Sequence, residues 1–347
     1  MIAWMNARLT VTRLTAAVVA AVTLAVTLAG AAVAAEVPRF WETEWPQTDF
    51  TRAEVPFAEI VSAGPPKDGI PAIDAPRFLS VRQASRLHAD REPVMSVEIG
   101  GEARAYPLRV MIWHGIVNDT VARTPIAVTY CPLCNSGVVY DRRIDGAVTT
   151  FGTTGKLRKS DLVMYDRATE SWWQQFEGRA LVGAKAGRTL DRVPSRLESF
   201  AEFEDRHPNG KVLVPENPEF RRYGANPYVR YDSSRQPFRY SGEYNGPGSP
   251  VMRVVSVAGK NAAWSLELLR QAEEIEIGDI TITWTPGQAS ALDARQIAEG
   301  RDVGNVTVTR RLPDGSEVDV AYDVPFAFAF EAFRPGAPIH HVSRTAY

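Results

Sequence analysis

The stretch PVMSVEIGGEARAYP, residues 93–107, decides the fold that we expect. Apolar and polar residues alternate over residues 93–99 and again over residues 103–106, and Gly100-Gly101 stands between the two runs. Two alternating runs joined by a pair of glycines are typical of a β-hairpin, because glycine readily adopts the positive φ that a two-residue turn requires. We therefore expect a chain built from short paired strands.

The residues that follow continue this pattern. Residues 116–120 and 126–130 are expected to form strands, and Asp145-Gly146 is a strong signal for a second hairpin turn. A short helix is expected over residues 107–113, with Pro107 in its first turn, where the missing N–H would be unpaired in any case. We predict a mainly β (α+β) fold with few short helices.

The chain also contains a weak internal repeat. Val128-Thr129-Tyr130-Cys131-Pro132 is echoed by Ile282-Thr283-Trp284-Thr285-Pro286. Chance similarity between β-hairpins is the alternative explanation. We predict two related β-rich halves packed together: residues 91–235, which carry the CPLC motif, and residues 236–347, a degenerate copy without cysteine.

The N-terminal segment has the pattern of an export signal. Arg8 and Arg13 precede an uncharged run over residues 14–35 that ends in small residues. This pattern is typical of a secretory signal peptide, although the run is also long enough to be an uncleaved membrane anchor. We expect residues 1–35 to be a signal peptide and the protein to be periplasmic or secreted. Residues 36–90, rich in proline and aromatic residues, are expected to form an extended arm.

The charge and the motifs argue against several classes of partner. The formal net charge of the 347 residues is −2, and no basic cluster indicates a surface for nucleic acid. A phosphate-binding glycine loop and a nucleophile elbow are both absent from the sequence, so no nucleotide cofactor is expected. We expect a metal ion and a small molecule as partners, and membrane contact only through an uncleaved N-terminal segment.

Cysteine occurs at two positions, Cys131 and Cys134, within TYCPLCNSG at residues 129–137. A disulfide between residues three apart closes too small a loop to restrain the unfolded chain much. Thiols are readily oxidised outside the cytoplasm. The pair is therefore expected to be bound to a metal, to cycle between thiol and disulfide, or to be a plain oxidised clamp.

A metal site is the first of these interpretations. A Cys-Pro-x-Cys turn after a strand is typical of metal-binding knuckles, in which the next residue often has a left-handed backbone. Asn135 tolerates that backbone better than most residues. His114 is the first candidate for a third ligand, and Met95, Met164 and Asp161 are weaker candidates.

The expected ion follows from the donor atoms. Two thiolates and one imidazole, from Cys131, Cys134 and His114, with one position left open, suit copper first and zinc next. Thiol–disulfide exchange is less favoured, because such motifs begin a helix, whereas here Asn135-Ser136-Gly137 leads into Val138-Val139-Tyr140, which is typical of a strand.

Several motifs resemble those of a bacterial family catalogued as DUF3179, a domain of unknown function. They are EARAYP at residues 102–107, HGIVND at 114–119, TYCPLC at 129–134, SDLVMYDR at 160–167 and NPYVRYD at 226–232. The resemblance implies export and a shared pocket, and it implies no reaction. Relatives commonly have an acidic residue after the histidine, where this chain has Gly115.

The shared motifs predict which residues surround the metal. We expect four residues in the pocket or behind the metal ligands: Asp119, Asp161, Met164 and Tyr165. In that position a carboxylate can accept a hydrogen bond from the imidazole N–H of a ligand. Three functions are compatible with the sequence: a metal-dependent oxidoreductase, a periplasmic metal-delivery protein, and a thiol–disulfide or structural module. The sequence does not decide whether the protein is an enzyme. An enzyme requires a pocket with an exchangeable coordination position, whereas a carrier requires a shallow, exposed site.

Overall fold

The computed structural model describes residues 37–342, so the expected signal segment at residues 1–35 lies outside the described residues. Strands contain 38% of the residues and helices 15%, which confirms a mainly β fold with few short helices. No helix formed by residues 37–342 has the length and hydrophobicity needed to cross a bilayer.

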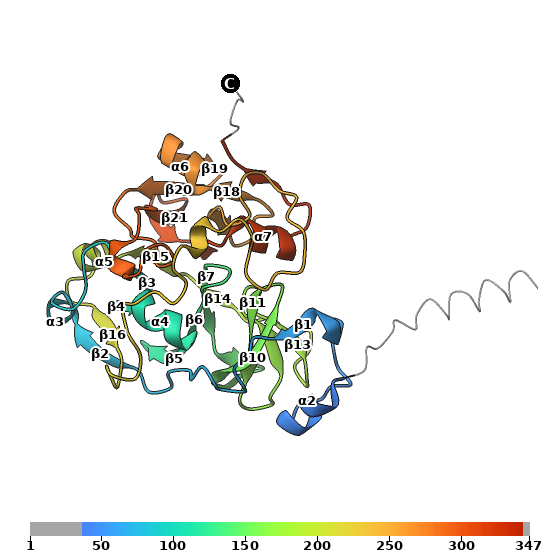
Figure 1. Ribbon diagram of the computed structural model, residues 1–347. Coiled ribbons are helices and arrows are strands. Elements are labelled where there is room, and N and C mark those ends of the chain that lie inside the picture. The colour runs from blue at the N-terminus through green and yellow to red at the C-terminus, as the bar shows by residue number, and fades with distance from the viewer. Residues whose placement is uncertain (1–36, 343–347) are drawn as a thin grey trace, which may run out of the picture.

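Five sheets are arranged in a ring like the blades of a propeller (Figure 1). Sheet A contains, in spatial order, β1 (Ile60–Ser62), β10 (Phe151–Arg158), β11 (Asp161–Asp166), β12 (Trp172–Gln174) and β13 (Arg179–Val182). Sheet B contains β14 (Arg192–Val193), β7 (Ser136–Asp141), β6 (Thr124–Cys131) and β5 (Ile116–Val121). Sheet C contains β15 (Arg196–Ser199), β3 (Pro93–Ile99), β4 (Glu102–Pro107), β16 (Lys211–Val214) and β2 (Arg77–Ser80).

The C-terminal part of the chain forms the other two sheets. Sheet D contains β23 (Tyr322–Asp323), β17 (Val254–Val257), β18 (Ala263–Ser265) and β24 (Ile339–His340), and sheet E contains β19 (Glu274–Ile277), β20 (Ile280–Thr285), β21 (Asn305–Arg311) and β22 (Glu317–Asp319). A small hairpin pairs β8 (Arg143–Ile144) with β9 (Ala147–Val148). Within residues 37–342 the α-helices are α2 (Arg39–Glu44), α3 (Val81–Ala84), α4 (Leu108–His114), α5 (Phe200–Arg206), α6 (Leu266–Ala272) and α7 (Ala327–Phe333), and the 3₁₀ turns are η1 (Phe57–Glu59), η2 (Tyr231–Ser233) and η3 (Ile297–Glu299).

The expected hairpins and helix form close to their predicted bounds. β3 and β4 pair antiparallel through a turn in which Gly100 and Gly101 have φ of 56° and 78°. The predicted helix is α4, which begins one residue later than expected because Pro107 is its N-cap, and it ends at His114, followed by Gly115 as the C-cap with φ of 70°. Local turn chemistry therefore places these elements.

The same order of elements occurs twice. In a first unit β3 and β4 are followed by α4, β5 and β6, and in a second unit β17 and β18 are followed by α6, β19 and β20. Met95 pairs with Tyr106 in the first hairpin as Val255 pairs with Trp264 in the second. Each unit also receives a parallel strand at the outer side of its first hairpin, β16 beside β4 and β24 beside β18.

The expected arrangement as two halves packed together is wrong, because the five sheets form one ring. The backbone N–H of Ser199 in sheet C donates to Asn305 Oδ1 of sheet E at 2.7 Å. Ser136 in sheet B donates to Asp323 Oδ2 of sheet D at 2.6 Å. Each unit therefore bonds to the other, and sheet A adds a fifth blade. The boundaries at residues 91–235 and 236–347 stay a prediction.

The N-terminal arm packs on sheet A. Trp41 and Trp45 contact Trp172 of β12 with ring centroids 4.9 and 5.4 Å apart. The ammonium group of Lys156 lies 5.1 Å from the ring of Trp45 and 2.8 Å from a carboxylate oxygen of Glu44. β1 and β2 of the arm join the edges of sheets A and C.

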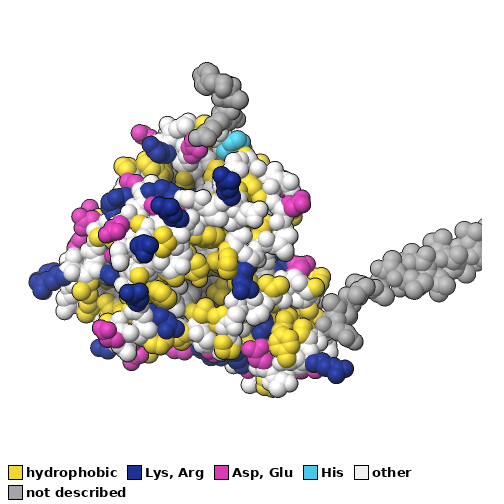
Figure 2. All heavy atoms as spheres, viewed as in Figure 1, with side chains coloured by type: hydrophobic (Ala, Val, Ile, Leu, Met, Phe, Trp, Pro, Cys, Tyr) yellow, Lys and Arg dark blue, Asp and Glu magenta, His cyan; other side chains and the backbone are white. Residues whose placement is uncertain are grey.

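The face in Figure 2 shows how apolar side chains are distributed over the ring. Hydrophobic side chains gather near the middle of this face, and Lys, Arg, Asp and Glu are spread around them. We therefore expect a binding site for an apolar molecule near the centre of the ring and not at its rim.

Candidate metal centre

The CPLC sequence forms the tight turn between β6 and β7. Cys131 ends β6 and pairs with Ser136, the first residue of β7. Asn135 has φ of 51°, which confirms the predicted left-handed backbone. Its Oδ1 accepts a hydrogen bond from the Tyr130 hydroxyl at 3.2 Å, and its Nδ2 donates to the carbonyl of Val324 at 2.7 Å. The turn is therefore held from both sides.

Sheet D anchors the second cysteine. The backbone N–H of Phe326 donates to the carbonyl oxygen of Cys134 at 2.8 Å. Asp323 accepts from the Ser136 hydroxyl at 2.6 Å and from the Gly137 N–H at 2.9 Å. These bonds fix the backbone on both sides of the Cys134 sulfur, so the ring of sheets sets the direction of the thiol.

A second tight turn, between β10 and β11 of sheet A, lies against the first. Lys159 and Ser160 have φ of 54° and 67°, although neither is glycine. Left-handed backbone costs an L-residue roughly 1–2 kcal/mol. The turn places the carbonyl of Ser160 3.9 Å from the sulfur of Cys131, and it brings Asp161 to the cysteines.

Cys131, Cys134 and Asp161 form one compact cluster. The two sulfurs and one carboxylate oxygen lie within 4.8 Å of one another, all three residues are buried, and no disulfide joins the sulfurs. Asp161 Oδ2 accepts from Gln174 Nε2 at 2.6 Å and from the Phe176 N–H at 2.9 Å. Asp161 Oδ1 is buried without a hydrogen-bond partner. A buried carboxylate oxygen of this kind requires a partner, and a metal ion can supply it.

The electrostatics of the cluster favour a cation. Burial raises the pKa of Asp161 to about 7, and burial together with the neighbouring Cys131 raises the pKa of Cys134. Burial also raises the pKa of the nearby Asp323 to about 6. Several groups that are anionic when deprotonated thus share a water-poor region, where a metal ion would favour their charged forms.

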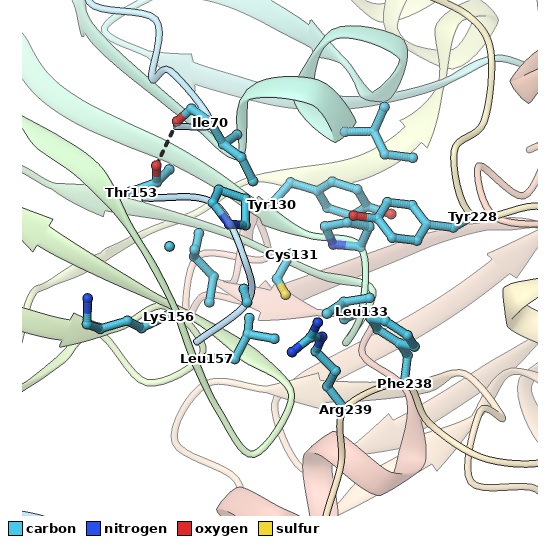
Figure 3. Close-up of a pocket in the computed structure, with 17 residues that line it drawn as sticks. Ile70, Tyr130, Cys131, Leu133, Thr153, Lys156, Leu157, Tyr228, Phe238 and Arg239 are labelled. Carbon is cyan, nitrogen blue, oxygen red and sulfur yellow. Dashed lines mark hydrogen bonds between the residues drawn. The ribbon is translucent and has the colours of Figure 1, made fainter. Parts of the chain in front are cut away.

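A cavity of about 170 Å³ reaches Cys131 from the surface (Figure 3). Its walls are mainly apolar, with Ile112, Leu133, Leu157 and Leu162 among them. Cys134 and Asp161 are not among its lining residues. The cluster therefore presents one sulfur to the cavity and keeps its other two donors behind the wall.

His114 is placed elsewhere. Its Nδ1 is 2.8 Å from the carbonyl oxygen of Pro71, and its Nε2 is 2.7 Å from the hydroxyl of Tyr223. Its ring also stacks on those of Tyr223 and Phe220, and burial lowers its pKa. The structure brings Asp161 to the two cysteines in the place expected for His114.

The other expected pocket residues divide between different surroundings. Asp119 accepts bonds from Arg104 Nη1 at 2.6 Å and from the Tyr106 hydroxyl at 2.6 Å, between sheets B and C. Met164 is in an apolar cluster with Trp173. The Tyr165 hydroxyl donates to Asp68 at 2.5 Å. Of the four, Asp161 alone is in the cluster with the cysteines.

Three residues that complete the site were not assigned to it from the sequence. Gln174 orients the carboxylate of Asp161, and Tyr228 and Arg239 line the cavity. Tyr228 belongs to the NPYVRYD motif, which was a usable signal. Nothing in the sequence around Arg239 marked it.

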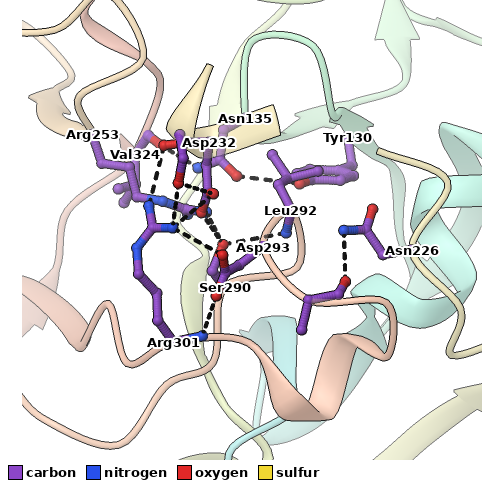
Figure 4. A network of polar contacts seen from close by, with 12 residues as sticks. Tyr130, Asn135, Asn226, Asp232, Arg253, Ser290, Leu292, Asp293, Arg301 and Val324 are labelled. Carbon is purple, nitrogen blue, oxygen red and sulfur yellow. Dashed lines mark hydrogen bonds and ion pairs between the residues drawn. The ribbon is translucent and has the colours of Figure 1, made fainter. Parts of the chain in front are cut away.

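A network of polar side chains supports the CPLC turn from the second unit (Figure 4). Asp232 accepts from Arg301 Nη1 at 2.8 Å and lies 3.6 Å from Arg253 Nη2. Arg253 also donates to Ser290 Oγ at 2.8 Å, and Ser290 donates to Asp232. The network lies beside Tyr130, the residue that precedes Cys131, and so connects the second unit to the site.

The sequence model of the family described as a protein of unknown function (DUF3179) matches residues 67–337. The match covers most of the chain, and it includes both cysteines and Asp161. Neither a curated protein nor a solved structure matches the chain. The chain therefore belongs to the DUF3179 family.

Proposed function

We propose that this protein is an exported, metal-dependent enzyme in which Cys131, Cys134 and Asp161 bind one metal ion. The observation that carries the proposal is the compact cluster of three buried donors with an unpartnered oxygen on Asp161. In a tetrahedral zinc site, ligand atoms lie about 3.5–3.8 Å apart. The three donors, within 4.8 Å of one another, need only small side-chain rotations to reach that geometry.

The carboxylate changes the preferred ion. A copper(I) ion favours soft sulfur donors, whereas zinc accepts sulfur, nitrogen and carboxylate oxygen alike. Because the third donor is Asp161 rather than an imidazole, we place zinc first and copper second. Zinc serves as a Lewis acid, so the reaction proposed is a polar one and not an electron transfer.

The position of the site supports an enzyme over a carrier. Three protein ligands leave a fourth tetrahedral position, which is typical of catalytic zinc. The cavity reaches Cys131, and the cluster lies beneath its wall. A carrier would be expected to expose its ion for transfer, and a buried cluster does not. The signal pattern at residues 1–35 supports export.

Thiol–disulfide exchange is the second candidate. Its support is the closeness of the Cys131 sulfur to the carboxyl group of Asp161. A carboxyl group with a pKa of about 7 suits a proton acceptor for a thiol. In this arrangement Cys131 faces the cavity and Cys134 lies behind it. Against it, the motif lies in a turn between strands and not at a helix N-terminus, where a thiol pKa is lowered.

The experiment measures metal and free thiols in the same purified, full-length sample. We expect one zinc per chain, with both thiols reduced when the protein is denatured in a chelator. Cys131→Ser and Cys134→Ser should lose the metal. Thr285→Ser, at the matching end of β20 in the second unit, is the control and should keep it. A chain with neither zinc nor copper and with both cysteines in a disulfide would overturn the proposal.

A further inference from the structure

The cavity beside Cys131 is lined by one cationic side chain, Arg239, that is exposed to solvent and pairs with no carboxylate among the described residues. Its lining includes Lys156 and Arg239 and no carboxylate. Lys156 contributes its apolar stem, because its ammonium group pairs with Glu44. Arg239 forms no ion pair with any of residues 37–342, and one guanidinium nitrogen donates to the carbonyl of Ser62 at 2.9 Å. A single cation at an apolar cavity is suited to an organic anion.

Tyr228 supplies a second free polar group. Its backbone N–H bonds to Asn226, but within the described part of the chain no hydrogen bond involves its hydroxyl. Burial raises the pKa of Tyr228 to about 12, so the hydroxyl stays protonated and can donate. Figure 3 shows Tyr228 and Arg239 on different sides of Cys131. The cavity therefore has two polar points separated by apolar wall.

We propose that this cavity binds a small organic monocarboxylate. The carboxylate pairs with Arg239, and the apolar body packs along Ile112, Leu157 and Leu162. The far end of the ligand meets the hydroxyl of Tyr228 and the side of the metal centre at Cys131. Only this last contact rests on the proposed metal function, since the other two require no ion.

The volume limits the size of the ligand. The cavity holds about 170 Å³. An engineered apolar cavity of about 150 Å³ binds benzene. The apolar body should therefore be about one six-membered ring, or a branched aliphatic chain of similar size. Benzoate is a suitable probe, with benzamide and benzylamine as neutral and cationic analogues of the same shape.

The test is calorimetric titration of the full chain with the three probes, in zinc-loaded and in chelator-treated form. Benzoate should bind to both forms, benzamide about tenfold more weakly, and benzylamine not at all, because an ion pair with Arg239 is available to benzoate alone. Arg239→Gln should weaken benzoate about tenfold and leave benzamide unchanged. Arg235→Gln, an exposed arginine on the same loop that does not line the cavity, is the matched control.

The outcomes distinguish failure of the proposed carboxylate site from failure of the proposed metal centre. Equal binding of the three probes, equal effects of Arg239→Gln and Arg235→Gln, or no binding to a folded protein would overturn the carboxylate site. If zinc binds normally while benzoate does not, this inference fails alone. If benzoate binds in an Arg239-dependent way to a chain with no affinity for zinc, the carboxylate site stands and the metal proposal fails. Ala63→Leu, which narrows the cavity, should weaken benzoate and benzamide alike.

Discussion

β6 and β20 hold the same place in the two hairpin–helix–hairpin units, but the chain leaves them differently. After β6, the tight turn at residues 132–135 leads directly into β7, and both cysteines are buried. After β20, a long loop at residues 286–304 precedes β21, and Thr285 is exposed. The comparison shows that the hairpin–helix–hairpin arrangement shared by the two units is not sufficient to form the metal site. The site requires the short turn together with sheet A, which brings Asp161.

The second unit nevertheless supports the first through a buried charge. Its long loop carries Ser290, which links Arg253 to Asp232 beside Tyr130. Arg253 Nε is buried without a partner, so this cation is held mainly by Asp232 and Ser290. The loop of the second unit, which carries no cysteine, thus packs behind the CPLC turn.

The largest expected effect breaks this support. Arg253→Ala leaves the buried Asp232 with Arg301 as its one remaining cationic partner among the described residues, and removing one partner of a buried ion pair costs about 3–5 kcal/mol. The free energy of unfolding in denaturant measures this cost. Arg270→Ala on α6, where the arginine is exposed, should change it by less than about 0.5 kcal/mol. Similar losses of unfolding free energy in the two variants would show that Arg253 does not stabilise the protein through Asp232.

A smaller loss of stability is expected from substitutions at Asn135, in the tight turn after β6 that the second unit lacks. Asn135→Ala should destabilise the protein by about 2–4 kcal/mol, because alanine disfavours a φ of 51° and the two side-chain hydrogen bonds are lost. Asn135→Gly keeps the backbone conformation and loses only the bonds, so it should cost about 1–2 kcal/mol. Denaturant unfolding gives both values. Equal losses would mean that the left-handed backbone at this turn is not a constraint.

The smallest effect concerns pH. The folded-state pKa values of Asp161, about 7, and Asp323, about 6, are raised above those of an unfolded chain. The folded protein therefore binds more protons, so the stability these groups contribute is complete below about pH 4 and is lost as pH rises through about 6 and 7. Metal-free protein should thus melt at a lower temperature at pH 8 than at pH 5.

Two variants isolate that effect. Asp161→Asn should flatten the decline of melting temperature between pH 5 and pH 8, whereas Asp302→Asn, at an exposed carboxylate of the second unit's loop, should not. Added zinc should reverse the trend, because metal binding requires deprotonated ligands and so tightens as pH rises. If melting temperature depends on pH in Asp161→Asn as it does in the unmodified protein, burial does not raise the pKa of the Asp161 carboxyl group.

Local features of the fold were predictable, and long-range packing was not. The hairpin at residues 93–107 and the left-handed Asn135 follow from turn chemistry within a few residues. The ring of five sheets depends on contacts such as Ser136 with Asp323, which are distant in sequence. The repeated order of elements was visible in the sequence, but not how the repeats interlock.

The candidate site shows the same division. The two cysteines could be identified because their spacing is local. His114 was preferred as the third ligand because it lies close in sequence, yet Pro71 and Tyr223 occupy its ring nitrogens. Asp161 is brought to the cysteines by the pairing of β10 with β11 and by the packing of sheet A on sheet B, which sequence periodicity does not reveal.

The most direct test of the account compares zinc affinity in Asp161→Asn and His114→Ala, each in the full chain and each checked for folding by circular dichroism. Titration against a competing chelator should show at least about a 100-fold weaker affinity for zinc in Asp161→Asn, and an affinity close to that of the unmodified protein in His114→Ala. Loss of zinc binding in His114→Ala with full retention in Asp161→Asn would contradict the proposed centre.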